Sequence, residues 1–192
     1  HYQGKRAFAP VLLNAFKESD ELCFYVLSDI LQDYKNATLQ LKLMDFNGKV
    51  LNKKVVKGEV PANSSTIFHK EPYADLAVDP TKTLLLMTLK TQQGEVLSEE
   101  IFYFNYPKDQ ELPITKVTCK TKQSNGRCEV ILSAKQLARD IFIEIPYQGA
   151  RFSDNFFDLL PGQTKKIVIT SNEIKKGEPI EIKIRHLKTI IK

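Results

Sequence analysis

Strict alternation of apolar and polar residues is the feature that most constrains the fold of this chain. The segment TLQLKLM, residues 38–44, places its leucines on one face and Gln40 and Lys42 on the other. Successive side chains of a strand point to opposite faces of a sheet, so this pattern predicts a half-buried strand. Residues 21–27, ELCFYVL, alternate in the same way. No convincing amphipathic helix accompanies these strands in the first part of the chain.

The same pattern recurs along the chain. Asn47-Gly48 separates two alternating segments and is a strong hairpin signal. In residues 180–187 isoleucines alternate with charged residues, so one face of the sheet is solvated and the sheet is antiparallel. The predicted strands are residues 9–16, 21–27, 38–44, 49–56, 65–70, 83–90, 95–104, 114–120, 127–133, 139–145, 165–170 and 180–187.

The segment NYPKDQELP, residues 105–113, interrupts the alternation with two prolines and several charges. We interpret it as a short linker. We therefore predict an all-β fold of two tandem immunoglobulin-like antiparallel β-sandwiches, residues 1–107 and residues 108–192. A single closed barrel fits less well, because the linker falls in the middle of the strand series.

The charge is unevenly distributed. Residues 1–107 carry 12 Lys or Arg and 13 Asp or Glu, whereas residues 108–192 carry 16 and 10. A basic half would suit nucleic acid, a membrane surface or an acidic glycan. The excess is scattered lysine without an arginine-rich stripe between stacking aromatics, so we expect a solvated surface and no nucleic-acid partner.

No stretch approaches the roughly 20 apolar residues of a membrane-spanning helix, and we expect no membrane span. The sequence begins His-Tyr-Gln, without an initiator Met or the features of a signal peptide. We interpret the chain as a piece of a longer protein.

Three cysteines, Cys23, Cys119 and Cys128, are too few for a disulfide scaffold. Cys119 and Cys128 flank a predicted hairpin whose two-residue turn, Asn125-Gly126, would not place them directly opposite each other. We therefore favour two buried free thiols, with a cross-strand disulfide as the alternative. The chain has no CxxC, no HExxH, no His/Asp cluster and no glycine-rich phosphate loop, so we expect neither a metal nor a cofactor.

No catalytic constellation is present in the sequence. Glycoside hydrolysis needs two carboxyl groups held roughly 5–9 Å apart. The adjacent carboxylates Glu99 and Glu100 point to opposite faces of a strand and cannot act as such a pair. GxSxG does not occur, and no serine lies near a histidine in a nucleophile motif. We assign no catalytic residue.

Aromatic residues in turns are the usual material of sugar-stacking sites. Our candidate carbohydrate contacts are Tyr34, Tyr73, Tyr147 and Phe152, and Phe156 and Phe157 lie in a similar context. The alternative for each is a core or rim aromatic. We favour that alternative because sugar platforms prefer Trp and Tyr, and the chain has no Trp.

The segment FSDNFFDLLPG, residues 152–162, joins three phenylalanines to a polar turn. We expect the polar residues 153–155 to bond backbone groups two or three positions along and so to turn the chain. Phe156 and Phe157 then point to opposite faces. The segment is predicted to cross from one sheet to the other, inserting at least one Phe and one Leu between them.

Two segments carry a family resemblance. FSDNFFDLLPGQTKKIVI, residues 152–169, resembles the closing immunoglobulin-like domain of glycoside hydrolase family 2 β-mannosidases. FAPVLLNAFKESDELCFYVLSD, residues 8–29, is similar to the opening of the preceding sandwich, and the two lie in the expected order. The family's closing domain often has Tyr where this chain has Phe156 or Phe157, and the missing hydroxyl favours a core role for these rings.

The resemblance implies the last two domains of an enzyme whose (β/α)₈ barrel carries two catalytic glutamates. That enzyme removes terminal non-reducing β-D-mannose with retention, and neither glutamate has a match in this chain. The implied partners are the catalytic barrel of the same parent chain and β-mannoside glycans. The implied compartment is periplasmic or extracellular for a bacterial parent and lysosomal for an animal one. A carbohydrate-binding module pair and a free-standing adhesion-type β-sandwich protein are the alternatives.

Overall fold

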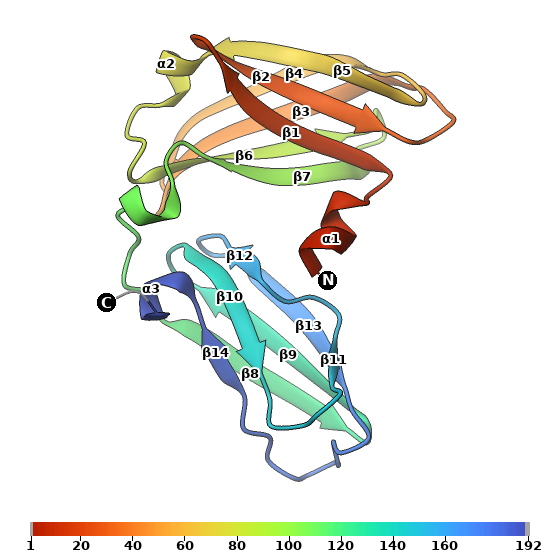
Figure 1. The fold of residues 1–192 in the computed structure, drawn as a ribbon, viewed down its shortest axis with the longest axis vertical. Helices are drawn as coiled ribbons and strands as arrows, with labels where there is room; N and C mark the ends of the chain where they lie inside the picture. The colour runs from red at the N-terminus through yellow and green to blue at the C-terminus, as the bar shows by residue number, and fades with distance from the viewer. Residues whose placement is uncertain (1, 191–192) are drawn as a thin grey trace. The chain divides into compact units, whose positions relative to one another are not determined.

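The computed structural model describes residues 2–190, in which contacts divide the chain into two compact units (Figure 1). The first unit contains Gln3–Asp45 and Lys49–Glu111. The second contains Phe46–Gly48 and the chain from Leu112 onward. Each unit is built from antiparallel sheets, with only short helices.

The first unit consists of a three-stranded sheet of order β1-β2-β5 and a four-stranded sheet of order β4-β3-β6-β7. Its strands are β1 (Val11–Glu18), β2 (Glu21–Ser28), β3 (Tyr34–Asp45), β4 (Val50–Val60), β5 (Ser64–Pro72), β6 (Thr83–Lys90) and β7 (Val96–Tyr103). Its helices are α1 (Tyr2–Ala7), α2 (Tyr73–Leu76) and the 3-10 turn η1 (Pro107–Asp109), which lies within the predicted linker.

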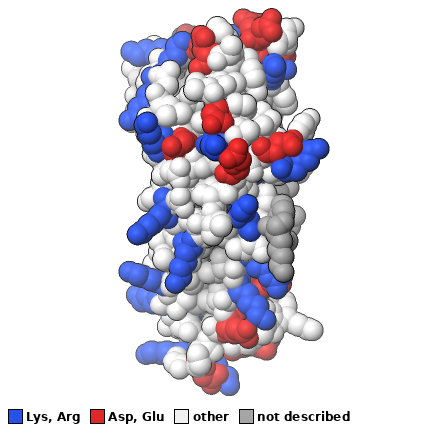
Figure 2. Space-filling view, turned by 90° about the vertical axis from the view of Figure 1, so that its left-hand side faces the viewer, with Lys and Arg blue, Asp and Glu red and all other residues white. Residues whose placement is uncertain are grey.

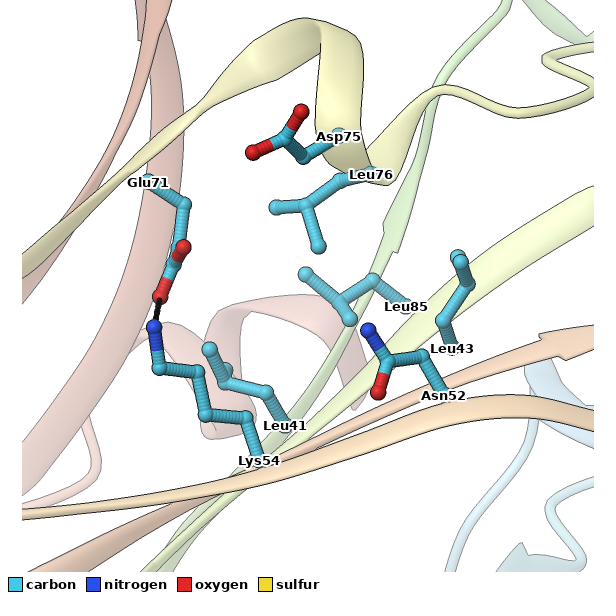
Figure 3. A pocket seen from close by; sticks show the side chains of 8 residues that line it. All are labelled: Leu41, Leu43, Asn52, Lys54, Glu71, Asp75, Leu76 and Leu85. Atoms are coloured by element: carbon cyan, nitrogen blue, oxygen red, sulfur yellow. Dashed lines mark ion pairs between the residues drawn. The ribbon is translucent and has the colours of Figure 1, made fainter.

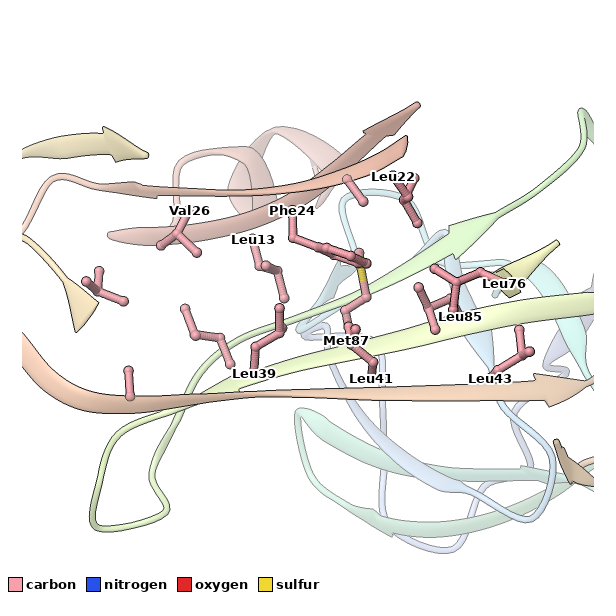
Figure 4. Packing of buried hydrophobic residues seen from close by; sticks show 14 of the residues in the cluster. Leu13, Leu22, Phe24, Val26, Leu39, Leu41, Leu43, Leu76, Leu85 and Met87 are labelled. Atoms are coloured by element: carbon pink, nitrogen blue, oxygen red, sulfur yellow. The ribbon is translucent and has the colours of Figure 1, made fainter. Parts of the chain in front are cut away.

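The core of the first unit lies between its two sheets. The leucines of β3 that alternation placed on one face are buried; Leu13 and Phe24 of the other sheet face them, and Met87 of the neighbouring strand β6 lies beside Leu41 (Figure 4). Gln40 and Lys42, on the other face of β3, remain partly exposed. The alternation therefore predicted correctly which face of this strand enters the core.

The second unit has a four-stranded sheet of order β11-β13-β9-β8 and a three-stranded sheet of order β12-β10-β14. The elements are β8 (Val117–Ser124), β9 (Arg127–Ala134), β10 (Ala138–Glu144), β11 (Arg151–Phe152), β12 (Phe157–Leu159), β13 (Thr164–Thr170), β14 (Lys183–Arg185) and α3 (Leu187–Ile190). Asn125-Gly126 forms the predicted two-residue turn, since Ser124 pairs with Arg127. Gly126 adopts φ +73, a left-handed conformation that costs glycine little.

The segment FSDNFFDLLPG crosses between the sheets of the second unit, as predicted. It begins in β11, which pairs with β13, and continues in β12, which pairs with β10 of the other sheet. Phe157 and Leu159 are buried, whereas Phe156 is 44% exposed.

For Ser153 and Asn155 the expectation of bonds to backbone groups two or three positions along was wrong. The Asn155 side chain instead reaches Ile143, twelve residues back, and Ser153 Oγ accepts a hydrogen bond from the Val168 N–H at 2.9 Å. The local bonds go to the next residue, as from the Phe156 N–H to Asn155 Oδ1. The turn is therefore held by neighbouring strands.

All three cysteines are free. Cys119 pairs with Leu132 and Cys128 with Gln123, so the two thiols are offset along the hairpin and the disulfide alternative is excluded. Cys128 is buried as expected, but the expectation that Cys119 is buried was wrong. Cys119 lies on β8, an edge strand whose residues are all exposed or only half-buried.

Candidate functional site

One candidate site is a cavity of about 230 Å³ in the first unit (Figure 3). Leucines from β3, β6 and α2 form its apolar part, and polar side chains from β4, β5 and α2 complete the lining. Asn52 and Lys54 face into it because they pair with Leu43 and Leu41, whose side chains point to the core. The lining residues are Leu41, Leu43, Leu76, Leu85, Asn52, Lys54, Glu71 and Asp75.

A β-bulge aims two polar residues of β5 toward this cavity. Phe24 pairs with His69 and Tyr25 with Ile67, so Phe68 is an extra residue in β5. Bulges of this kind redirect the side chains that follow them. The His69 ring stacks on Phe24, with ring centroids 5.9 Å apart and planes at 19°.

Glu71 is the centre of the polar contacts. Its Oε1 accepts hydrogen bonds from both Lys54 Nζ and His69 Nε2, and the residue is 9% exposed. Burial raises the pKa of Glu71, but the bonds and charges of Lys54 and His69 outweigh it and hold the pKa below its usual range. Glu71 is therefore a stable carboxylate in a small ion cluster.

This arrangement is unsuited to glycoside hydrolysis. The general acid of a glycosidase needs a raised pKa so that it carries a proton near neutral pH, whereas the pKa of Glu71 is lowered. The second carboxylate at the cavity, Asp75, is exposed on α2. Glu99 and Glu100 lie on the edge strand β7, where Glu99 accepts a hydrogen bond from Thr88 Oγ1 at 3.0 Å.

No group of three His, Cys, Asp or Glu side chains within residues 2–190 could hold a metal ion. The helices of that same stretch are too short and too polar to cross a membrane. Figure 2 shows basic and acidic side chains interspersed over one side of the molecule. Glu129, for example, pairs with Lys166 at 2.9 Å and with Arg127 at 3.0 Å, as expected of a solvated surface.

The four predicted carbohydrate contacts are divided between the units. Tyr34 and Tyr73 pack against the core of the first unit, and Tyr147 and Phe152 against that of the second; all four are partly buried. Tyr73 is further engaged, because Lys17 Nζ lies 4.2 Å from its ring centroid and its hydroxyl donates to the Phe104 carbonyl at 3.3 Å. A role for these four residues in sugar contact stays a prediction.

Sequence reasoning missed an aromatic pair, exposed Phe16 and half-buried Tyr25, on the outer face of the β1-β2-β5 sheet. Their ring centroids are 5.8 Å apart with planes at 66°, and Phe16 is 51% exposed. The alternation pattern contained the signal. Phe16 follows buried Ala15, and Tyr25 follows buried Phe24, so both rings point away from the core. The cavity was also missed, because its lining residues lie far apart in sequence.

Comparison with known proteins gives two family matches. Residues 20–109 match the model of the mannosidase Ig/CBM-like domain, and residues 112–190 match that of an Ig-fold domain. The predicted architecture of two immunoglobulin-like sandwiches is thereby confirmed. No curated protein matches the chain.

Solved structures share the fold. The β-D-mannosidase from Dictyoglomus thermophilum is 24% identical, with a TM-score of 0.76 over 96% of this chain and 22% of that chain. The exo-chitosanase CsxA from Amycolatopsis orientalis is 14% identical, with a TM-score of 0.59 over 96% and 26% of the respective chains. This chain thus spans about a quarter of the proteins that it resembles.

Proposed function

The chain is a tandem of immunoglobulin-like domains of glycoside hydrolase family 2 enzymes, and from this premise we propose that it is the non-catalytic C-terminal domain pair of a β-mannosidase. The parent enzyme would remove terminal non-reducing β-D-mannose with retention, using a catalytic barrel elsewhere in the same polypeptide. The domain pair would support that barrel. A periplasmic or extracellular compartment for a bacterial parent, or a lysosomal one for an animal parent, belongs to the same proposal.

One observation carries the proposal. The cavity in the first unit contains a carboxylate, Glu71, but its bonds to Lys54 and His69 lower its pKa, so it has no proton to donate to a leaving group. The apolar part of the cavity is leucine, which offers nothing to orient a water molecule. Within residues 2–190, two packed cores and a cavity whose buried carboxylate cannot act as an acid fit a supporting role.

The test is an activity assay on the purified chain with a chromogenic β-mannoside, beside the full-length parent. We expect turnover by the parent and none by the chain. Turnover by the chain that Glu71→Gln abolishes would contradict a non-catalytic role. A parent without β-mannosidase activity would contradict the assignment to such an enzyme.

A second candidate function is carbohydrate binding, which the polar lining of the cavity favours. Asn52, Lys54 and Asp75 offer an amide, an ammonium and a carboxylate beside an apolar surface, and sugar hydroxyls bond to such groups. Calorimetry with manno-oligosaccharides at millimolar concentration tests it, with Asn52→Ala as the variant and Asn172→Ala, in the second unit, as the control. Heat that Asn52→Ala alone removes supports binding at the cavity, and the absence of heat contradicts it.

A further inference from the structure

The outer face of the three-stranded sheet in the first unit is largely apolar, although Asn14 lies opposite Tyr25 and Ser65 lies opposite Leu27. In cross-strand register Leu12 lies opposite Leu27, and Tyr25 lies opposite Ile67. Phe16, Leu27 and Ile67 are 51%, 40% and 43% exposed. We call this surface the outer apolar face: Leu12, Phe16, Tyr25, Leu27 and Ile67.

The outer side of the four-stranded sheet in the same unit is a solvated face and serves as a comparison. On its outer side Lys42 and Lys53 lie directly opposite each other, and Lys57 and Lys90 flank Thr38. Antiparallel sheets with one buried face normally carry such polar residues on the other. Contiguous exposed apolar side chains are uncommon on monomeric proteins and mark interaction surfaces. On the four-stranded sheet exposed Val55 lies on β4 between Lys53 and Lys57, whereas the outer apolar face joins apolar residues across three strands, and we infer that a partner covers it.

The outer apolar face also has the anatomy of an interface. The rings of Phe16 and Tyr25 meet edge to face. The Tyr25 hydroxyl donates to Glu18 Oε1 at 2.5 Å, so the Tyr25 ring is held in place. Lys70 and Glu21 form an ion pair at 3.0 Å at the same end of the sheet as Glu18. Protein interfaces combine an apolar, aromatic centre with a polar rim, and rigid rings lose little entropy on docking.

We propose that the outer apolar face packs against the catalytic barrel domain of the same polypeptide. This inference rests on the proposed function. The chain aligns with only 22% of the β-D-mannosidase structure, so a parent of that size would contain a large domain able to cover the sheet. A glycan fits this face poorly, because Leu12, Leu27 and Ile67 offer no hydrogen bonds to hydroxyl groups, and Asn14 Oδ1, opposite Tyr25, already accepts a bond from the Ala15 N–H.

The experiment compares thiol accessibility in the full-length parent and in the 192-residue chain. Ile67→Cys is introduced into both in a Cys119→Ser background, since Cys119 is exposed and Cys23 and Cys128 are buried. Labelling with a maleimide is followed at each site by peptide mass mapping. The matched control is Val55→Cys, on the outer side of the other sheet, where Val55 is 60% exposed.

We expect the thiol introduced at position 67 to react at least tenfold more slowly in the parent than in the isolated chain, and the thiol at position 55 to react equally in both. Equal reactivity at position 67, or protection at both positions, would overturn the assignment of this face. Protection at position 67 that grows with the concentration of the isolated chain would instead identify a second copy as the partner. A parent that lacks a barrel or β-mannosidase activity would refute the proposed function itself. An active parent with an unprotected position 67 refutes only this inference.

Discussion

The side-chain amide of Asn155 bonds both main-chain polar groups of Ile143. Asn155 Oδ1 accepts from the Ile143 N–H at 2.9 Å, and Asn155 Nδ2 donates to the Ile143 carbonyl at 3.0 Å. Asn155 is 3% exposed, so no water can replace these bonds without disturbing the packing. At the point where the chain crosses between sheets, the Asn155 side chain thus supplies the two hydrogen bonds to β10 that a neighbouring strand would otherwise supply.

Asn155→Ala should therefore destabilise the second unit by about 2–5 kcal/mol, because it leaves two buried backbone groups without partners. The measurement is chemical denaturation followed by circular dichroism. Asn172→Ala is the matched control, since Asn172 is exposed in the β13–β14 connection, and it should change stability by less than about 0.5 kcal/mol. Equal effects of the two substitutions would show that the Asn155–Ile143 bonds contribute nothing to stability.

Phe157→Ala should cost about 3–5 kcal/mol of stability, because it empties a core site between the two sheets of the second unit. Phe156→Ala should cost much less. Phe156 is 44% exposed and stacks on Phe142 with ring centroids 4.6 Å apart, a contact worth about 0.5–1.5 kcal/mol. Thermal unfolding of both variants checks the difference. Unchanged melting temperatures in both would contradict the burial of Phe157 in the core.

Local periodicity predicted most of the fold because every second side chain of a strand points to the same face of the sheet, so the buried face can be identified from the sequence. Residues 83–90 were predicted as a strand and form β6 with the same bounds, and residues 127–133 became β9 with one residue added. The crossing at residues 152–162 was also predictable, since turn-forming polar residues separate two apolar positions.

Features that depend on distant partners could not be predicted in this way. The bond from Asn155 to Ile143 requires β10 to lie alongside, which no local pattern specifies. The bulge at Phe68 shifts the phase of β5 by one residue and turns His69 and Glu71 toward the core side. Lys54 then meets Glu71 across the cavity, although 16 residues separate them in the printed sequence. The candidate site is thus a tertiary feature, built from residues that individually look like ordinary surface charges.

Asp140→Asn should stabilise the protein at pH 7 by less than about 0.5 kcal/mol, roughly 1–2 °C in melting temperature, because solvent screens a side chain that is 46% exposed and Arg139 Nε lies 3.8 Å from its Oδ2. Asp140 adopts φ +52, a left-handed conformation that Asn tolerates well. Burial and the nearby Asp158 carboxylate raise the pKa of Asp140 and make its charged form unfavourable. The folded-state pKa is raised, so the wild-type protein gains stability as the pH falls through it, and the advantage of Asn should shrink.

Thermal unfolding of the wild type and Asp140→Asn between pH 4 and pH 7 measures this difference. Asp140→Ala serves as the control, because it removes the same charge but places a less tolerant residue at a positive φ. It should be less stable than Asp140→Asn at every pH. A destabilising Asp140→Asn at pH 7 would contradict the unfavourable charge.

The pH dependence of the second unit should depend on His186. This residue is 4% exposed, and its Nε2 lies 3.2 Å from the Thr115 carbonyl oxygen. Burial lowers the pKa of His186, and the bond to Thr115 offsets only part of that effect. Because the unfolded chain, with a His pKa near 6.5, binds the proton more readily than the folded one, stability should fall as the pH drops below about 6.5.

Calorimetric unfolding at pH 7.5 and pH 5.5 checks this expectation. The transition of the second unit should occur at a lower temperature at pH 5.5, and His186→Gln should reduce that difference because glutamine does not titrate. His69→Gln, in the first unit, is the control and should leave the pH dependence of the second transition unchanged. If His186→Gln retains the full wild-type difference between the two pH values, another group must take up the proton, and the buried imidazole is not the cause.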